Sequence, residues 1–170
     1  MAQDNAIASG VVDMLKEDHT KVKELFEQFE SAQGRERGQI AATAIQELEI
    51  HAALEEKLIY PAIREEIDED DLMNEAVEEH HVVHLLIREL KKLKASDPTF
   101  QAKFMVLSEL VKHHIEEEEG NVLPKAEESD IDWQSLEEMV LKRREALMSK
   151  ASSGGRSARS SSNRRSKSKK

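Results

Sequence analysis

The sequence contains no cysteine among its 170 residues, and it is poor in glycine, proline and aromatic residues. Without cysteine the chain forms no disulfide, thiolate zinc site or iron–sulfur cluster, so any metal must be bound by histidine and carboxylate side chains. Six glycines and three prolines are few for an all-β domain and favour helices. No segment has the roughly 18 apolar residues of a membrane span, and the first residues lack the pattern of a signal peptide. We expect an all-α, soluble, cytoplasmic protein.

Charge is abundant but unevenly distributed. Residues 149–170 carry eight basic residues and no acidic one, whereas residues 1–148 carry 17 basic and 35 acidic residues, a net charge of −18. The basic segment has no apolar residue larger than alanine, so burial cannot offset its ordering entropy and we expect a disordered tail. Such a tail predicts at most weak, nonspecific binding of nucleic acid or anionic membrane surfaces.

Four long segments carry apolar residues at alternating spacings of three and four, which is typical of helices in a bundle. The segments are about residues 9–32, about residue 44 to Pro61 (where proline should end or kink the helix), 73–87, and 98–122 after an N-cap at Ser96 or Asp97. A shorter helix is expected over residues 132–148. Short connections favour antiparallel neighbours. The sequence therefore predicts an extension of residues 1–9, an up-down-up-down four-helix bundle in residues 10–148, and the tail of residues 149–170.

The helices also form an internal repeat. When the first helix is written above the third, His19 aligns with His80. When the second is written above the fourth, His51, Glu55 and Pro61 align with His114, Glu118 and Pro124, all three at one common offset. These alignments indicate two helical hairpins related by a pseudo-twofold axis.

Seven polar side chains occupy core-facing positions where leucine or isoleucine would otherwise be expected. They are His19, His51, Glu55, His80, His84, His114 and Glu118. Burying so many unpartnered groups would cost several kcal/mol each, so they must bind one another or metal. Five imidazoles and two carboxylates exceed the needs of one ion and suit two ions about 3.5 to 4 Å apart, bridged by the carboxylates. Iron, zinc, copper and manganese all accept such ligands.

The ordered motifs EDHTKV, HAALE, HHVVH and HHIEEEE resemble the hemerythrin family, specifically bacterial hemerythrin-like domains of the HHE cation-binding type, over about residues 10–148. The resemblance implies two iron ions in a non-haem di-iron centre with an oxo or hydroxo bridge. It implies His80, His84 and His114 on one iron, His19 and His51 on the other, and Glu55 and Glu118 as bridges. The second iron then has a free position for dioxygen or another small diatomic ligand. Lys23 takes the register of His84 in the first helix.

The bridging carboxylate of the fourth helix departs from the pattern of oxygen carriers. Those proteins have an aspartate five residues after the histidine, where this chain has Glu119. The helical stripe and the repeat both favour Glu118, because Glu119 lies about 100° further round the helix. We therefore predict Glu118 as the ligand and keep Glu119 as the alternate. His81, His113 and Tyr60 are expected outside the ligand set, with Tyr60 packing at the end of the bundle.

The resemblance predicts a protein that binds dioxygen or a related small molecule in storage, sensing or scavenging. One alternative is a di-iron enzyme acting on peroxide or nitric oxide, or in iron–sulfur repair. Another is a non-catalytic iron or zinc buffer or stress-response module. The sequence is compatible with a monomer and leaves the oligomeric state open.

Overall fold

This computed structural model describes the backbone of residues 2–165 and the side chains of residues 10–153. The described residues form helices and no strand. The all-α prediction is therefore confirmed for them. In chain order the elements are α1 (Ala2–Ser31), α2 (Gly34–Leu54), the π-helical turn η1 (Glu55–Ile59), α3 (Tyr60–Glu66), α4 (Asp70–Leu90), α5 (Pro98–Glu117), the π-helical turn η2 (Glu118–Val122), α6 (Leu123–Glu127) and α7 (Trp133–Arg165). Within this part of the chain, every helix is too short or too polar to cross a membrane.

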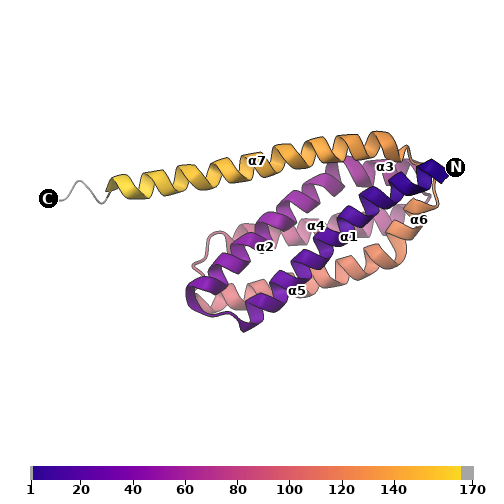
Figure 1. Cartoon of the computed structure of the whole chain (residues 1–170). Coiled ribbons are helices and arrows are strands. Elements are labelled where there is room, and N and C mark those ends of the chain that lie inside the picture. The colour runs from indigo at the N-terminus through magenta and orange to yellow at the C-terminus, as the bar shows by residue number, and fades with distance from the viewer. Residues whose placement is uncertain (1, 166–170) are drawn as a thin grey trace.

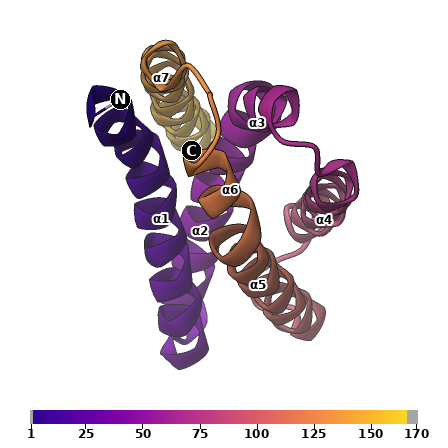
Figure 2. The same ribbon diagram turned by 90° about the vertical axis from the view of Figure 1, so that its right-hand side faces the viewer.

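Successive long helices run in opposite directions along one axis (Figure 1). The chain returns along α2 after α1, and again along α5 after α4, and α7 then packs against α1 and α2. Figure 2, seen from the end that holds α3 and α6, places α7 on the side of α1 and α2, away from α5. The connection from α1 to α2 turns at Gly34, whose φ of +55° suits a residue without a side chain. The Asp97 carboxylate caps α5 by accepting a hydrogen bond from the Thr99 N–H at 2.8 Å.

Two apolar clusters fill the interior. One includes Leu15 and Leu54 together with Trp133 of α7, and the other includes Val22 and Leu48. The core-facing histidines stand in the sequence between members of the two clusters, as His19 does between Leu15 and Val22. The polar layer is consequently enclosed above and below by apolar side chains, which weakens its contact with water.

Each helical hairpin contains a π-helical turn that begins at a buried glutamate, Glu55 or Glu118. A proline follows each turn, at Pro61 and Pro124. Proline has no N–H to donate, and its ring collides with the carbonyl four residues earlier in a regular α-helix, whereas a wider turn accommodates it. The predicted end or kink at Pro61 therefore takes the form of a π turn before the proline, and the helix continues to Glu66.

The ends of the chain differ from the prediction. Helix α1 begins at Ala2, inside the predicted extension of residues 1–9, and α7 continues to Arg165, past the predicted helix end at Met148. The prediction ended the helix at Met148 because that residue is the last large apolar one in the sequence. The absence of later apolar side chains limits how far the helix can pack against the bundle, but it does not end the helix. The last part of α7 extends beyond the bundle (Figure 1). The predicted disorder of residues 149–170 is thus not confirmed for residues 149–165, and residues 166–170 lie outside the described part.

Candidate metal centre

Six of the predicted ligands meet in the layer between the two apolar clusters. They are His19 of α1, His51 of α2, Glu55 of η1, His80 of α4, His114 of α5 and Glu118 of η2. Each is at most 7% exposed. The inward register that predicted these six residues therefore agrees with their burial.

The first half-site, as we call it, comprises His19, His51, Glu55 and Glu118, with one ligand atom from each within 4.8 Å of all the others. His19 Nε2 lies 3.1 Å from His51 Nε2 and 3.2 Å from Glu118 Oε2. His51 Nε2 lies 2.9 Å from Glu55 Oε1. Two imidazole nitrogens and two carboxylate oxygens at this spacing form a set that can surround one metal ion.

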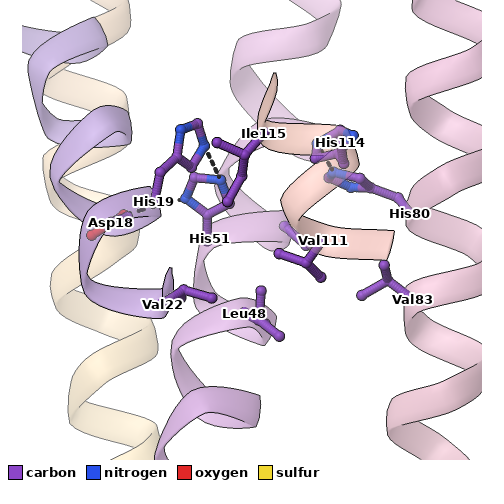
Figure 3. A pocket seen from close by; sticks show the side chains of 11 residues that line it. Asp18, His19, Val22, Leu48, His51, His80, Val83, Val111, His114 and Ile115 are labelled. Atoms are coloured by element: carbon purple, nitrogen blue, oxygen red, sulfur yellow. Dashed lines mark hydrogen bonds and ion pairs between the residues drawn. The ribbon is translucent and has the colours of Figure 1, made fainter. Parts of the chain in front are cut away.

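The second half-site comprises Glu55, His80 and His114. His80 Nε2 lies 3.1 Å from His114 Nε2 and 3.3 Å from Glu55 Oε2. Glu55 thus faces the first half-site with Oε1 and the second with Oε2, which is the position of a bridging carboxylate. Figure 3 shows the two histidine pairs, His19 with His51 and His80 with His114, on either side of the Ile115 side chain.

Each of the four histidines also has a carboxylate at its outer nitrogen. The distances from Nδ1 to the nearest carboxylate oxygen are 2.8 Å for His19 and Glu119, 3.4 Å for His51 and Asp18, 3.0 Å for His80 and Glu56, and 2.6 Å for His114 and Glu79. A proton on Nδ1 is donated to the carboxylate, which fixes the ring and leaves Nε2 free for a metal. All four Nε2 atoms therefore face the interior of the layer.

This arrangement leaves the inner carboxylates without donors. All four carboxylate oxygens of Glu55 and Glu118 are buried and accept no hydrogen bond from the described residues. When Nδ1 carries the histidine proton, the adjacent Nε2 has none to donate. A buried carboxylate without a partner is costly, and a bound cation removes that cost. The donor set therefore fits a metal centre.

The electrostatics of the metal-free layer also favour positive charge, which a second proton on an imidazole can supply. Burial alone lowers the pKa of His51, but the Glu55 charge and hydrogen bonds of the protonated ring to Asp18 and Glu55 raise it to about 10. Burial raises the pKa of Glu55, and the charges and hydrogen bonds of His51 and His80 outweigh it and hold that pKa well below its usual value. In the absence of metal, a proton on a histidine can therefore supply the positive charge that a bound metal cation would supply.

Tyr60 makes contacts that the sequence did not predict. It packs in the first apolar cluster, as expected at the end of the bundle, but its hydroxyl also lies 3.3 Å from both His80 Nε2 and His114 Nε2. Burial, followed by the charges of Glu55 and Glu118, raises the pKa of the phenol well above its ordinary value. An offset of five residues from Glu55 matches the π turn and not the α-helical spacing, so the stripe rule did not select it.

His84 is the predicted ligand that neither half-site includes. Its Nε2 lies 2.6 Å from Glu56 Oε1, and its side chain is 39% exposed. Because Glu56 also contacts His80 Nδ1, it stands between His84 and the inner layer. The alternate ligand Glu119 likewise contacts the outer nitrogen of His19, whereas Glu118 faces the inner one. His81 and His113 are exposed.

A small cavity of about 30 Å³ adjoins the four histidines (Figure 3). Its other wall is apolar and includes Val22, Leu48, Val83 and Val111. Such a volume holds one or two water molecules or a diatomic molecule. The layer therefore has space for a small ligand next to the histidines.

Comparisons with known proteins concern the family and the fold of the chain. A family model described as the hemerythrin HHE cation-binding domain matches residues 10–126. The crystal structure of a hemerythrin HHE cation-binding domain-containing protein from Mycobacterium kansasii superposes with a TM-score of 0.69 at 26% identity, covering 82% of this chain and 87% of that one. A DNA nickase from Nostoc sp. is 27% identical over 113 residues, 66% of this chain. This chain spans about a third of that relative, 32% of its length.

Proposed function

Because the chain belongs to the hemerythrin HHE cation-binding domain family, we propose that it holds two iron ions that bind dioxygen or a related small molecule for storage, sensing or scavenging. The observation that carries the proposal is the set of four buried carboxylate oxygens on Glu55 and Glu118 that accept no hydrogen bond from the described residues. They lie against the four histidine Nε2 atoms, and the outer carboxylates orient these rings through Nδ1. Two cations satisfy all of these atoms.

Two ions are supported over one by the way in which Glu55 is shared. Its two oxygens face different histidine pairs, and a single ion cannot take both pairs and both glutamates without moving them. Iron would supply redox activity and an open coordination position for a small ligand. His19, His51, Glu55 and Glu118 would hold one ion, and Glu55, His80 and His114 the other.

At the second half-site we propose the Tyr60 hydroxyl in the place that the resemblance gives to His84. The hydroxyl is within 3.3 Å of both inner nitrogens of that half-site, whereas His84 contacts Glu56. His84 joins the ligands only if its side chain leaves Glu56. Zinc and manganese accept the same residue types, so the iron assignment needs the experiment below.

Dioxygen or another diatomic ligand is supported by the small, partly apolar cavity beside the histidines. The test is to reconstitute the metal-free protein with ferrous iron without air, remove unbound iron, and mix it with oxygen while recording the absorption spectrum. The proposal predicts an oxygen-dependent spectrum that is stable over minutes, and a zinc-loaded control without any change. Consumption of added peroxide or nitric oxide over many turnovers would favour the enzyme alternative. Absence of any oxygen response would favour the iron or zinc buffer.

A second proposal concerns the basic segment of residues 149–170, which would attach the protein weakly to polyanions such as nucleic acid or anionic membranes. Five of its eight basic residues lie on the part of α7 between residues 149 and 165, which extends beyond the bundle (Figure 1). Clustered positive charge attracts phosphate groups without a base-specific contact. We do not carry the nickase activity of the Nostoc relative over to this chain, which spans about a third of that protein.

A further inference from the structure

One arginine of α7 is linked to the candidate centre through a single intervening carboxylate. Arg144 donates from Nη1 to Asp18 Oδ2 at 2.8 Å and from Nη2 to Asp18 Oδ1 at 2.5 Å. Asp18 Oδ2 in turn lies 3.4 Å from His51 Nδ1, and the Asp18 side chain is 9% exposed. Three helices, α7, α1 and α2, are thereby joined in one chain of contacts that ends at a ligand of the first half-site.

Arg144 stands at an inward position of α7 where an apolar residue would suit the core. Trp133, Leu136 and Val140 form the buried stripe of this helix, and Leu147 packs against the same cluster. Arg144 continues the stripe, four residues after Val140 and three before Leu147. Its planar group donates two parallel hydrogen bonds, which fix the orientation of the Asp18 carboxylate as well as its position.

The other half of the internal repeat is built differently. Glu79 aligns with Asp18 in the repeat. Glu79 lies 2.6 Å from His114 Nδ1, just as Asp18 lies beside His51 Nδ1. Where Asp18 faces Arg144, Glu79 faces His113 Nε2 at 3.7 Å. Arg144 also lies beyond residues 10–126, the segment that matches the family model. The arginine contact is therefore a feature of one half-site and of a helix outside the matched domain.

We propose that Arg144 is a positioning residue for the first half-site, which fixes Asp18 so that His51 keeps Nε2 directed at the metal. The proposal rests on the two-ion centre proposed above. Because coupling between two sites is reciprocal, docking of α7 and metal binding by the first half-site favour each other. The second half-site does not share this dependence.

The test uses the full chain, freed of metal, and measures zinc affinity by competition with a chromophoric chelator. The variant Arg144→Ala is made in a His114→Ala background, which leaves the first half-site intact, and in a His51→Ala background, which leaves the second. Loss of a residue that orients a metal-binding histidine lowers affinity about 10- to 100-fold. We expect this loss in the first background and a change of less than about twofold in the second. The matched control is Arg143→Ala, which removes an exposed neighbouring arginine.

Further variants separate positioning from damage to the fold. Asp18→Asn should cause the same selective loss, and adding Arg144→Ala to it should lower affinity little further, because the two residues act in series. The double variant removes both charges of the Asp18–Arg144 pair and leaves neither without its partner. It therefore tests the proposal even if Arg144→Ala alone unfolds, with circular dichroism as the check.

The outcomes for this inference and for the two-ion proposal are distinct. Wild-type protein that binds fewer than two zinc ions contradicts the two-ion proposal. Unchanged affinity in the His114→Ala background, or equal losses in both backgrounds, overturns the role of Arg144.

Discussion

The orientation of each imidazole decides what the centre can do. A histidine binds metal through one nitrogen, and the hydrogen bond at the other nitrogen determines which one is free. Here Asp18, Glu56, Glu79 and Glu119 each face an Nδ1 atom. The candidate ligands are therefore oriented in the absence of metal, which would reduce the cost of ordering them if a metal binds.

The first prediction separates the two neighbouring glutamates of η2. Glu118→Ala should remove at least one metal ion per chain, because Glu118 faces the inner nitrogen of His19. Glu119→Ala should keep both ions and weaken binding of the ion at the first half-site about 10- to 100-fold, because Glu119 orients His19 from outside. Elemental analysis after dialysis against a weak chelator measures the difference, with the exposed Glu116→Ala as control. A larger loss of metal in Glu119→Ala would instead identify Glu119 as the ligand, at the five-residue spacing from the histidine that oxygen carriers have.

The second prediction concerns the histidines. His51→Ala and His114→Ala should each release metal, whereas His81→Ala, His113→Ala and His84→Ala should retain most of it. The first two face the inner glutamates, and the other three are partly or fully exposed. Metal content per folded chain gives the comparison. Equal loss in His84→Ala and His114→Ala would mean that His84 turns inward when metal binds, as the family resemblance implies.

The inward position of the six buried histidines and glutamates could be predicted from sequence, because a polar residue at a buried position leaves a visible break in an apolar stripe. The outer carboxylates could not, because Asp18 and Glu79 lie one position off the stripe and reach a histidine on the neighbouring helix. Their signal is the repeat itself, since Asp18 aligns with Glu79 just as His19 does with His80, and Glu56 aligns with Glu119. Tyr60 was missed as a contact because its position depends on a π turn.

At the scale of helices, the spacing of apolar residues predicted that the long helices exist, but it did not predict their π turns or where they end. The alternation of three and four identifies the core-facing side of a helix, but it assumes about 3.6 residues per turn. It therefore misses the wider turns η1 and η2. It also misses the helix after Met148, where no large apolar side chain is present to form a stripe.

The third prediction compares two glycines. Gly34→Ala should lower the free energy of unfolding by about 1 kcal/mol, because alanine is strained at a φ of +55°. Gly120→Ala in η2 should be neutral or raise it by up to about 1 kcal/mol, since an added Cβ meets nothing within 4 Å and alanine favours helix. Urea unfolding monitored by circular dichroism measures both. Equal effects of the same sign would contradict these backbone assignments.

For the molecule as a whole, the metal-free protein should be least stable at the extremes of pH. Burial raises the pKa of Asp18, but hydrogen bonds from His51 and Arg144 outweigh it and lower that pKa from 3.8 to about 2. Its stabilising contribution is full above 3.8 and is lost as the pH falls toward 2. The pKa of His51 is raised from 6.5 to about 10, so its contribution is full below 6.5 and is lost as the pH rises toward 10.

The fourth prediction is therefore a thermal midpoint of the metal-free protein that declines on both sides of about pH 4 to 6.5. His51→Gln should flatten the alkaline decline, because it removes the group that titrates there. Calorimetry across the pH range measures both curves. An alkaline decline that is unchanged in His51→Gln would show that another group is responsible.

The fifth prediction concerns residues 149–170. Their deletion should leave metal content and thermal midpoint nearly unchanged, because Ser152 and Ser153 are exposed and Met148, just before the cut, is 52% exposed. Any affinity for a DNA duplex should vanish with the deletion, because the remaining body has a net charge of −18. In the intact protein the affinity should fall steeply with salt. Binding that survives both truncation and high salt would reveal a recognition surface on the bundle.

The number of metal ions per chain tests the central claim most directly. The metal-free protein is reconstituted with ferrous iron without air, desalted, and analysed for iron and protein. Two half-sites that share Glu55 predict two iron ions per chain, both lost in the double variant Glu55→Ala and Glu118→Ala. One ion or none in the folded wild-type protein would contradict the account.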